Sequence, residues 1–174
     1  LKVVAVERNA INGGSFSLSV ARREAPYPEA AAEFGALLRA EESYATLAPY
    51  RAFADAVRRH REELNALVRA EASAGRTILG YGASTKGNVI LQYCGLGEKE
   101  IACIGEVNAD KFGCFTPGTL IPIVPEAEVR ARKPDSLLVL PWHFKDFIVE
   151  KESAYLRSGG KLVFPLPRLH AVSA

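Results

Sequence analysis

Hydrophobic and polar positions alternate in two short runs at the start of the chain. Residues 1–7 are mostly apolar, and residues 16–21 alternate apolar side chains with serines, the period of two that is typical of a β-strand. Between them, Asn12-Gly13-Gly14 is a strong turn signal. The pattern predicts a β-hairpin over residues 1–25. Because an isolated hairpin is marginal in water, we expect its apolar face to pack on the long helix that follows or on another chain.

The next segment has a helical period. Residues 30–74 are rich in alanine, and residues 25–29 before them contain two prolines and have the composition of a linker. Pro49 suits an early helical position and Gly75 a C-terminal stop. The sequence therefore predicts a helical connecting segment over residues 26–75. Apolar side chains recur at helical spacing in its second part at Phe53, Val57, Leu64, Leu67 and Val68.

From Arg76 onward, short apolar runs alternate with amphipathic segments. Such alternation is typical of a parallel sheet with right-handed crossovers and helices on both faces. We therefore predict an α/β fold, a Rossmann-like three-layer αβα domain over residues 76–174, with a mostly parallel five-stranded sheet, after the hairpin and the helical segment. Strands are expected at 77–81, 101–106, 120–123, 136–140 and 161–164, and helices at 84–93, 125–132 and 144–158.

Composition narrows the function classes. The 174 residues are 48% hydrophobic and 24% charged, with a formal net charge of +2, which does not favour nucleic acid as a partner. No apolar run approaches the roughly 20 residues that span a bilayer, and no signal-peptide order is present. Three cysteines without paired spacing and three scattered histidines predict reduced thiols in a cytoplasmic protein and no zinc site.

The stretch 78–88 carries the clearest chemical signal. Its sequence, Ile-Leu-Gly-Tyr-Gly-Ala-Ser-Thr-Lys-Gly-Asn, describes a strand that feeds a glycine-rich turn and opens a helix. Ser84 and Thr85 can cap that helix, whose free N–H groups favour an anion, and Lys86 adds a full positive charge. The pattern predicts a phosphate-bearing ligand. The alternative is a tight strand-to-helix connection with a good N-cap.

This turn satisfies neither of two familiar phosphate-binding fingerprints. The dinucleotide pattern requires glycine at position 85, where the chain has threonine, and a P-loop requires Lys and Ser/Thr after Gly87, where Asn88 and Val89 stand. An ATPase is therefore disfavoured. Glu106 lies 24 residues beyond Gly82, near the position where an acid binds ribose hydroxyls in dinucleotide folds, so a ribose-bearing ligand stays open.

Other unusual residues follow the predicted strands. In an open α/β sheet, ligands bind beyond the carboxyl ends of the strands, where Glu106, Asn108, Trp142 and His143 are expected. Residues 115–123 contain a Pro-Gly turn that suits either a sheet edge or a ligand loop. The sequence contains no Ser-His-Asp set, paired carboxylates or metal cluster, and we predict no catalytic residues in this chain.

Several segments resemble the C-terminal domain of S-adenosylmethionine-dependent sugar C-methyltransferases. They are residues 80–88, the Thr-Pro-Gly-Thr and Ile-Pro-Ile motifs within 116–123, Pro134-Asp135, and the Leu-Pro-Trp-His-Phe motif at 140–144. The hairpin with its Asn-Gly-Gly-Ser turn resembles the end of the central methyltransferase domain. The similarity thus extends over nearly the whole chain.

The resemblance implies a nucleotide-sugar-binding domain of a larger enzyme. In this family, a zinc-binding module and a central domain that binds S-adenosylmethionine precede the C-terminal domain, and the catalytic residues belong to the central domain. The chain has no methionine and begins at Leu1, so we expect it to be an excised part of such a polypeptide, inactive alone and without its own cofactor. The implied partners are a nucleotide-diphosphate sugar and the missing N-terminal and central domains.

The resemblance also implies roles for individual residues. The glycine turn would form the diphosphate cradle, Glu106 and Asn108 would face the nucleoside, and Trp142 and His143 the sugar. An NAD(P)-binding oxidoreductase domain and a non-enzymatic nucleotide-binding module remain as alternatives. The predicted cradle consists of Gly80, Gly82, Ala83, Ser84, Thr85, Lys86, Gly87 and Asn88.

Overall fold

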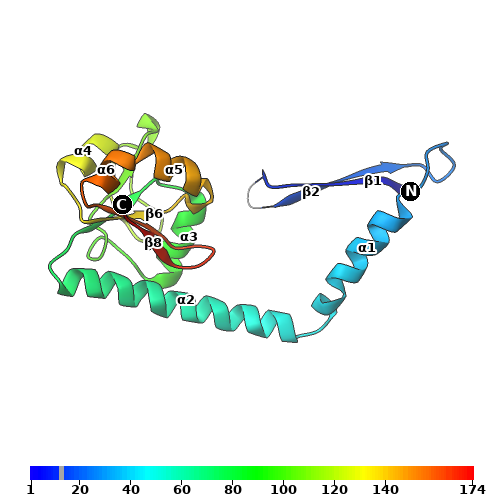
Figure 1. The fold of residues 1–174 in the computed structure, drawn as a ribbon, viewed down its shortest axis with the longest axis horizontal. Coiled ribbons are helices and arrows are strands. Elements are labelled where there is room, and N and C mark those ends of the chain that lie inside the picture. Colours follow the sequence, from blue (N-terminus) through cyan, green and yellow to red (C-terminus); the bar gives the residue numbers. More distant parts are fainter. Residues whose placement is uncertain (12–13) are drawn as a thin grey trace. The chain divides into compact units, whose positions relative to one another are not determined.

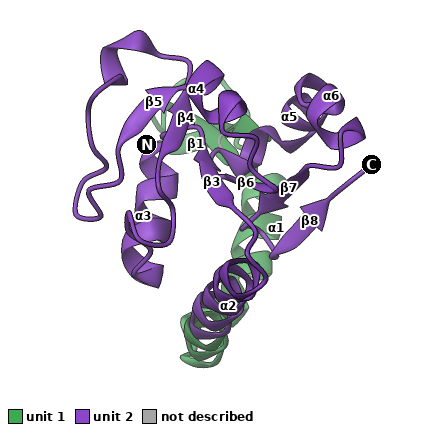
Figure 2. Cartoon of the chain, turned by 90° about the vertical axis from the view of Figure 1, so that its left-hand side faces the viewer, with its two compact units in different colours: residues 1–56 green, residues 57–174 purple. Residues whose placement is uncertain are grey.

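The computed structural model describes residues 1–11 and 14–174, which form two compact units. Residues 1–56 make the first unit and residues 57–174 the second (Figure 2). The boundary falls inside a long helix, so the predicted connecting segment 26–75 is shared between the units.

The first unit is a β-hairpin with a helix against it (Figure 1). Strand β1 (Lys2–Asn9) pairs antiparallel with β2 (Ser15–Ala21), as the alternating pattern predicts. The predicted turn at Asn12 and Gly13 lies outside the described residues. Helix α1 (Ala31–Glu41) contacts β1, and the Ala30 N–H donates to the Val3 carbonyl oxygen at 2.9 Å.

The expected cover over the hairpin is partial. Phe16 and Leu18 of β2 line a cleft with Phe34 and Leu38 of α1. They nevertheless remain 67% and 44% exposed, and within the described part of the first unit no side chain is fully buried. This unit therefore presents apolar surface rather than a core of its own.

The helical segment is broken in one place. A 3-10 turn, η2 (Glu42–Ala45), separates α1 from α2 (Ala48–Ser73). Pro49 lies at the start of α2, and Gly75 follows its end with φ +69°, as expected of a helix stop. In the second unit, α2 buries Leu64 and Val68 in the core.

The second unit is a mixed α/β structure on a six-stranded, mostly parallel sheet. The strand order is β5-β4-β3-β6-β7-β8, and among the described strand pairs of this sheet only β7 and β8 are antiparallel. The strands are β3 (Ile78–Tyr81), β4 (Ile104–Glu106), β5 (Ile123–Pro125), β6 (Ser136–Val139), β7 (Lys161–Phe164) and β8 (His170–Val172).

Helices cover both faces of this sheet (Figure 2). On one face, α2 and α3 (Thr85–Cys94) pack on residues such as Ile78 and Leu138. On the other, α4 (Glu126–Ala131), α5 (Lys145–Lys151) and α6 (Ser153–Arg157) pack on residues such as Leu79 and Leu137. Consecutive residues of the strands alternate between the two cores, because side chains of a strand point to opposite faces.

The structure corrects four details of the predicted domain. The sheet has six strands rather than five, because the chain returns as β8, which is only three residues long and too short for an alternation signal. The strand expected at 120–123 is shifted to Ile123–Pro125, and the one expected at 101–106 is shortened to Ile104–Glu106. The helix expected at 144–158 is split at Glu152 into α5 and α6, after a 3-10 turn η4 (Trp142–Phe144).

Among the described residues, no helix combines the length and apolar character that crossing a bilayer requires.

Candidate functional site

A cleft of about 500 Å³ lies beyond the carboxyl end of β3. Here the strand order changes direction: β4 follows on one side of β3 and β6 on the other. The loops after these strands separate at such a switch point and leave room for a ligand. The cleft is lined by Tyr81, Gly82, Ala83, Ser84, Glu106, Val107, Lys111, Glu126, Pro141, Phe144, Phe147, Ile148 and Lys151.

The glycine turn forms one wall and opens α3 as predicted. Ser84 is the N-cap, with extended backbone, and its Oγ accepts the Gly87 N–H at 3.0 Å. Gly82 has φ +75°, a region that disfavours side chains, and a Cβ there would lie 2.7 Å from Pro141 Cγ. A Cβ on Gly87 would lie 2.5 Å from Leu140 Cβ, so this glycine lets α3 approach the end of β6.

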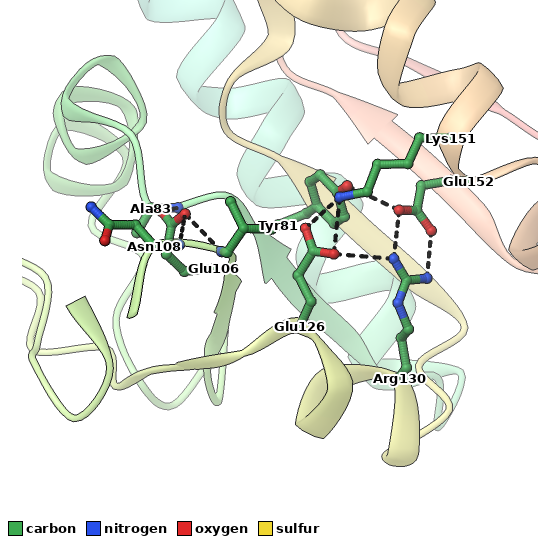
Figure 3. A network of polar contacts seen from close by, with 9 residues as sticks. Tyr81, Ala83, Glu106, Asn108, Glu126, Arg130, Lys151 and Glu152 are labelled. Atoms are coloured by element: carbon green, nitrogen blue, oxygen red, sulfur yellow. Dashed lines mark hydrogen bonds and ion pairs between the residues drawn. The ribbon is translucent and has the colours of Figure 1, made fainter. Parts of the chain in front are cut away.

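Both polar groups of the Ala83 backbone are bound by an ion pair in which Glu106 is buried and Lys111 is partly exposed (Figure 3). Its N–H donates to Glu106 Oε2 at 3.0 Å, and its carbonyl oxygen accepts from Lys111 Nζ at 2.9 Å. Lys111 Nζ also donates to Glu106 Oε2 at 3.1 Å. We call Glu106, Lys111 and the Ala83 backbone the turn clamp. It ties the loop after β4 to the turn after β3.

Glu106 has little acceptor capacity left for a ligand. Its Oε1 accepts the backbone N–H groups of Val107 and Asn108 at 2.8 and 3.1 Å. Burial alone would raise the pKa of this carboxyl, but the Asn108 and Val107 N–H groups and Lys111 together lower it. Glu106 is therefore ionised near neutral pH and is used by the protein itself.

A second polar network forms the floor of the cleft (Figure 3). The Tyr81 hydroxyl donates to Glu152 Oε1 at 2.9 Å, and Arg130 donates to both oxygens of Glu152 at 2.6 and 2.7 Å. Arg130 also donates to Glu126, which accepts from Lys151 Nζ at 2.9 and 3.0 Å. Lys151 Nζ lies 5.3 Å from the centre of the Tyr81 ring. Glu126 and Lys151 line the cleft, whereas the Glu152 side chain is fully buried beneath it.

The buried end of this network is charged. Burial would raise the pKa of Glu152, but hydrogen bonds from Arg130 and Tyr81 and the charges of Arg130 and Lys151 lower it. Burial, followed by the hydrogen bond to Glu152, raises the pKa of Tyr81. A neutral phenol therefore donates to a carboxylate, the arrangement in which both groups are satisfied.

The opposite wall is apolar and comes from the segment after β6. Pro141, Phe144, Phe147 and Ile148 line it. Phe144 and Phe147 are 57% and 66% exposed, and Val107, 68% exposed, faces the cleft from the loop after β4. The cleft therefore joins a helix N-terminus and several charges to an aromatic surface.

The structure brings part of the predicted site together. Gly82, Ala83, Ser84 and Glu106 line the cleft, and Thr85 and Lys86 are exposed in the first turn of α3 beside it. Gly80 and Gly87 are buried in packing contacts. Asn88 Oδ1 is buried and makes no hydrogen bond to the described residues.

The other predicted residues do not line the cleft as the described part of the chain defines it. Asn108 caps the short turn η3 (Ala109–Lys111), with its Oδ1 accepting the Asp110 N–H at 3.0 Å. Trp142 is half-buried against both cores. His143 contacts the Trp142 and Phe144 rings, and burial, then the charge of Lys86, lowers its pKa.

Sequence reasoning missed nine of the thirteen residues that line the cleft. Phe144 and Phe147 carried a signal, because two aromatic residues at i and i+3 follow directly after a strand end. Lys111, Glu126 and Lys151 carried none, since charged residues on short surface helices are common. The missed residues are Tyr81, Val107, Lys111, Glu126, Pro141, Phe144, Phe147, Ile148 and Lys151.

Comparison with known proteins agrees with the resemblance seen in the sequence. The model of the C-methyltransferase C-terminal domain matches residues 10–167. The chain belongs to this family. It is also 35% identical over its whole length to the C-methyltransferase NovU of Streptomyces niveus.

The matching family model describes the C-terminal domain of C-methyltransferases. The chain spans 42% of the length of NovU. Among the described residues, no group of three His, Cys, Asp or Glu side chains is arranged to bind a metal ion.

Proposed function

We propose that this chain is the substrate-binding part of a sugar C-methyltransferase and binds a nucleotide-diphosphate sugar. The observation that carries the proposal is the cleft at the switch point, where a capped helix N-terminus meets charged and aromatic side chains in a C-methyltransferase family member. In this proposal S-adenosylmethionine is bound by another part of the polypeptide, and the chain alone does not catalyse methyl transfer.

The diphosphate would lie at the start of α3. A helix N-terminus presents partly positive N–H groups to an anion, and α3 is ten residues long. Lys86, exposed in its first turn, supplies a full charge, while Ser84 and Thr85 supply hydroxyls. Gly82 allows the sharp turn that places these groups at the start of α3. The turn clamp holds this turn in place.

The role of Glu106 supports a sugar nucleotide over NAD. In a dinucleotide fold the acid after the second strand accepts hydrogen bonds from ribose hydroxyls. Here the oxygens of Glu106 already accept from three backbone N–H groups and from Lys111. We therefore propose that Glu106 braces the turn and does not bind ribose hydroxyls.

Calorimetric titration tests this proposal. We expect the chain to bind a dTDP-sugar and to show no comparable affinity for NAD or S-adenosylmethionine. Lys86→Ala should weaken dTDP-sugar binding by about 1.5–3 kcal/mol, the usual worth of a charge-assisted hydrogen bond. The control is Lys99→Ala, a surface lysine of the segment between α3 and β4. Tight NAD binding without dTDP-sugar binding would favour the oxidoreductase alternative.

We further propose that the exposed side chains of β2 contact the remainder of the methyltransferase polypeptide. The relative NovU extends well beyond the matched region, and Phe16, Leu18 and Val20 are 67%, 44% and 55% exposed. Limited proteolysis of the longer polypeptide checks this contact. Rapid removal of the hairpin from the full-length enzyme would contradict it.

A further inference from the structure

Two phenylalanines of the cleft wall, Phe144 and Phe147, are largely exposed. Phe144 ends η4, and Phe147 lies one helical turn later in α5, so the two rings share a face. Phe144 and Phe147 are 57% and 66% exposed, so most of their apolar surface contacts water, which is unfavourable. Clustered exposed apolar surface commonly marks a binding site.

The surroundings of these rings suit a flat ligand. Val107 also lines the cleft, from the loop after β4, whereas the two phenylalanines come from the segment after β6. Because β4 and β6 flank β3 on opposite sides, the apolar lining comes from both sides of the switch point and suits a planar group. The cleft of about 500 Å³ is within the range of small-molecule sites, which are mostly apolar with a few convergent polar groups.

The polar groups lie at two different places in the cleft. The N-terminal turn of α3 begins at one wall, whereas Glu126 and Lys151 lie on the floor close to Tyr81. Lys151 donates to both oxygens of Glu126, and Arg130 donates to Oε2, which leaves one acceptor site on Glu126 Oε1 and one N–H of Lys151 for a ligand. Every nucleobase carries both donors and acceptors along its edge. A ligand with an anionic end and a planar end bearing donors and acceptors would match both.

We propose that the base of a nucleoside diphosphate lies against Phe144 and Phe147, with its edge toward Glu126 and Lys151. This inference rests on the proposed function, since it assumes that the diphosphate lies at the start of α3. It assigns the base to the segment after β6 and leaves Glu106 and Asn108 to hold the loop after β4.

Titration of the 174-residue chain with dTDP and with inorganic pyrophosphate separates the two parts of the site. Stacking on an aromatic ring contributes about 1–3 kcal/mol per base, or roughly 5- to 150-fold in affinity. We expect Phe147→Ala and Phe144→Ala each to weaken dTDP binding at least about fivefold and to leave pyrophosphate binding within twofold. Lys86→Ala should weaken the binding of both dTDP and pyrophosphate.

Two further variants serve as controls for effects on the structure rather than on base binding. Phe53→Ala removes a ring that is 70% exposed and is not among the residues that line the cleft, and it should leave both affinities unchanged. Phe147→Trp keeps a stacking surface, so it should retain dTDP affinity. Its indole fluorescence should be quenched by dTDP but not by pyrophosphate.

The outcomes distinguish this inference from the proposed function. Wild-type dTDP affinity in Phe144→Ala and Phe147→Ala, with a loss in Lys86→Ala, would overturn the base site and leave the diphosphate site standing. A chain that binds neither dTDP nor pyrophosphate would overturn both.

Discussion

Ala83 has no functional group in its side chain, yet its peptide groups are among the most constrained in the site. Its N–H and carbonyl oxygen are bound by Glu106 and Lys111, from a loop 23 to 28 residues later. These bonds fix the direction in which the turn enters α3. The carboxylate and ammonium are thus used for geometry, since the charged form of each makes stronger hydrogen bonds than a neutral group.

Glu106→Gln tests this constraint. The amide retains one acceptor but loses the charge that pairs with Lys111, so we expect a loss of about 1–3 kcal/mol in the free energy of unfolding. Urea denaturation measures it. Asp110→Asn, an exposed acid in the same loop, is the control and should stay within about 0.5 kcal/mol of wild type. Equal stability of Glu106→Gln and wild type would argue against the clamp.

Gly87 illustrates a second residue-scale effect. A Cβ at this position would lie 2.5 Å from Leu140 Cβ and 2.9 Å from Ser84 Oγ, so Gly87→Ala should force α3 away from β6. We expect a loss of about 1–3 kcal/mol, typical of overpacking. Gly97→Ala, whose nearest neighbour would be 3.5 Å away, should cost clearly less. Similar losses in the two variants would contradict the packing argument.

At the scale of elements, a charged residue interrupts an otherwise continuous helical region. Glu152 lies between α5 and α6 with φ −92° and ψ 15°, and its side chain turns inward to Arg130 of α4 and Tyr81 of β3. One buried carboxylate therefore connects three elements on the same face of the sheet. The connection orients α5, which carries Phe147 and Lys151 into the cleft.

Arg130→Ala should lower the free energy of unfolding much more than Arg132→Ala does. It leaves the fully buried Glu152 carboxylate without its ion pair, and we expect a loss of about 3 kcal/mol. Arg132→Ala breaks an exposed pair with Glu128 at 2.6 Å and should cost below about 1 kcal/mol. Denaturant titration of both variants measures the difference, and equal losses would contradict a buried network.

Acid should destabilise the second unit by protonating three of its hydrogen-bonded carboxylates. The pKa values of Glu71, Glu106 and Glu152 are all lowered in the folded chain. A carboxyl group whose pKa is lowered by folding stabilises the fold at pH values above its ordinary pKa, near 4.5. This contribution is lost as the pH falls through the pKa of the folded state. Stability should therefore decline from about pH 5 downward. Glu152→Gln, measured over the same pH series, should show a shallower decline, and an unchanged slope would contradict this assignment.

At the scale of the molecule, the two units differ in how they are stabilised. All fully buried side chains in the described chain belong to residues 57–174. The first unit has a paired hairpin and a contacting helix but exposes its large apolar side chains. The second unit therefore contains the buried core and the proposed ligand site, and the first unit carries the apolar surface for which we propose a contact with the remainder of the polypeptide.

Removal of residues 1–56 tests this division. We expect the remaining chain to unfold cooperatively, with a midpoint within about 3 °C of the main transition of the full chain, because no buried contact is lost. Scanning calorimetry measures both. Removal of residues 168–174 should instead lower the midpoint, since it strips β8 from β7. A collapse of the transition on removing residues 1–56 would show that the units are interdependent.

The fold was predicted best where the local pattern and the tertiary structure agree. Residues 162–164 and 137–140 are continuous apolar runs, because both faces of a central parallel strand are covered. The break at Glu152 and the edge strand at 170–172 could not be predicted. The first depends on a distant arginine, and the second on an available sheet edge.

The candidate site divides along the same physical boundary. The sequence by itself determined the glycine turn, its Ser84 cap and the family, because these depend on residues adjacent in the chain. Only the tertiary structure decided that Glu106 is consumed by the Ala83 backbone, and that Phe147 and Lys151 share a cleft with that turn. Those relations join residues 23 to 68 positions apart, and sequence patterning does not encode which distant side chains a folded sheet brings to one edge.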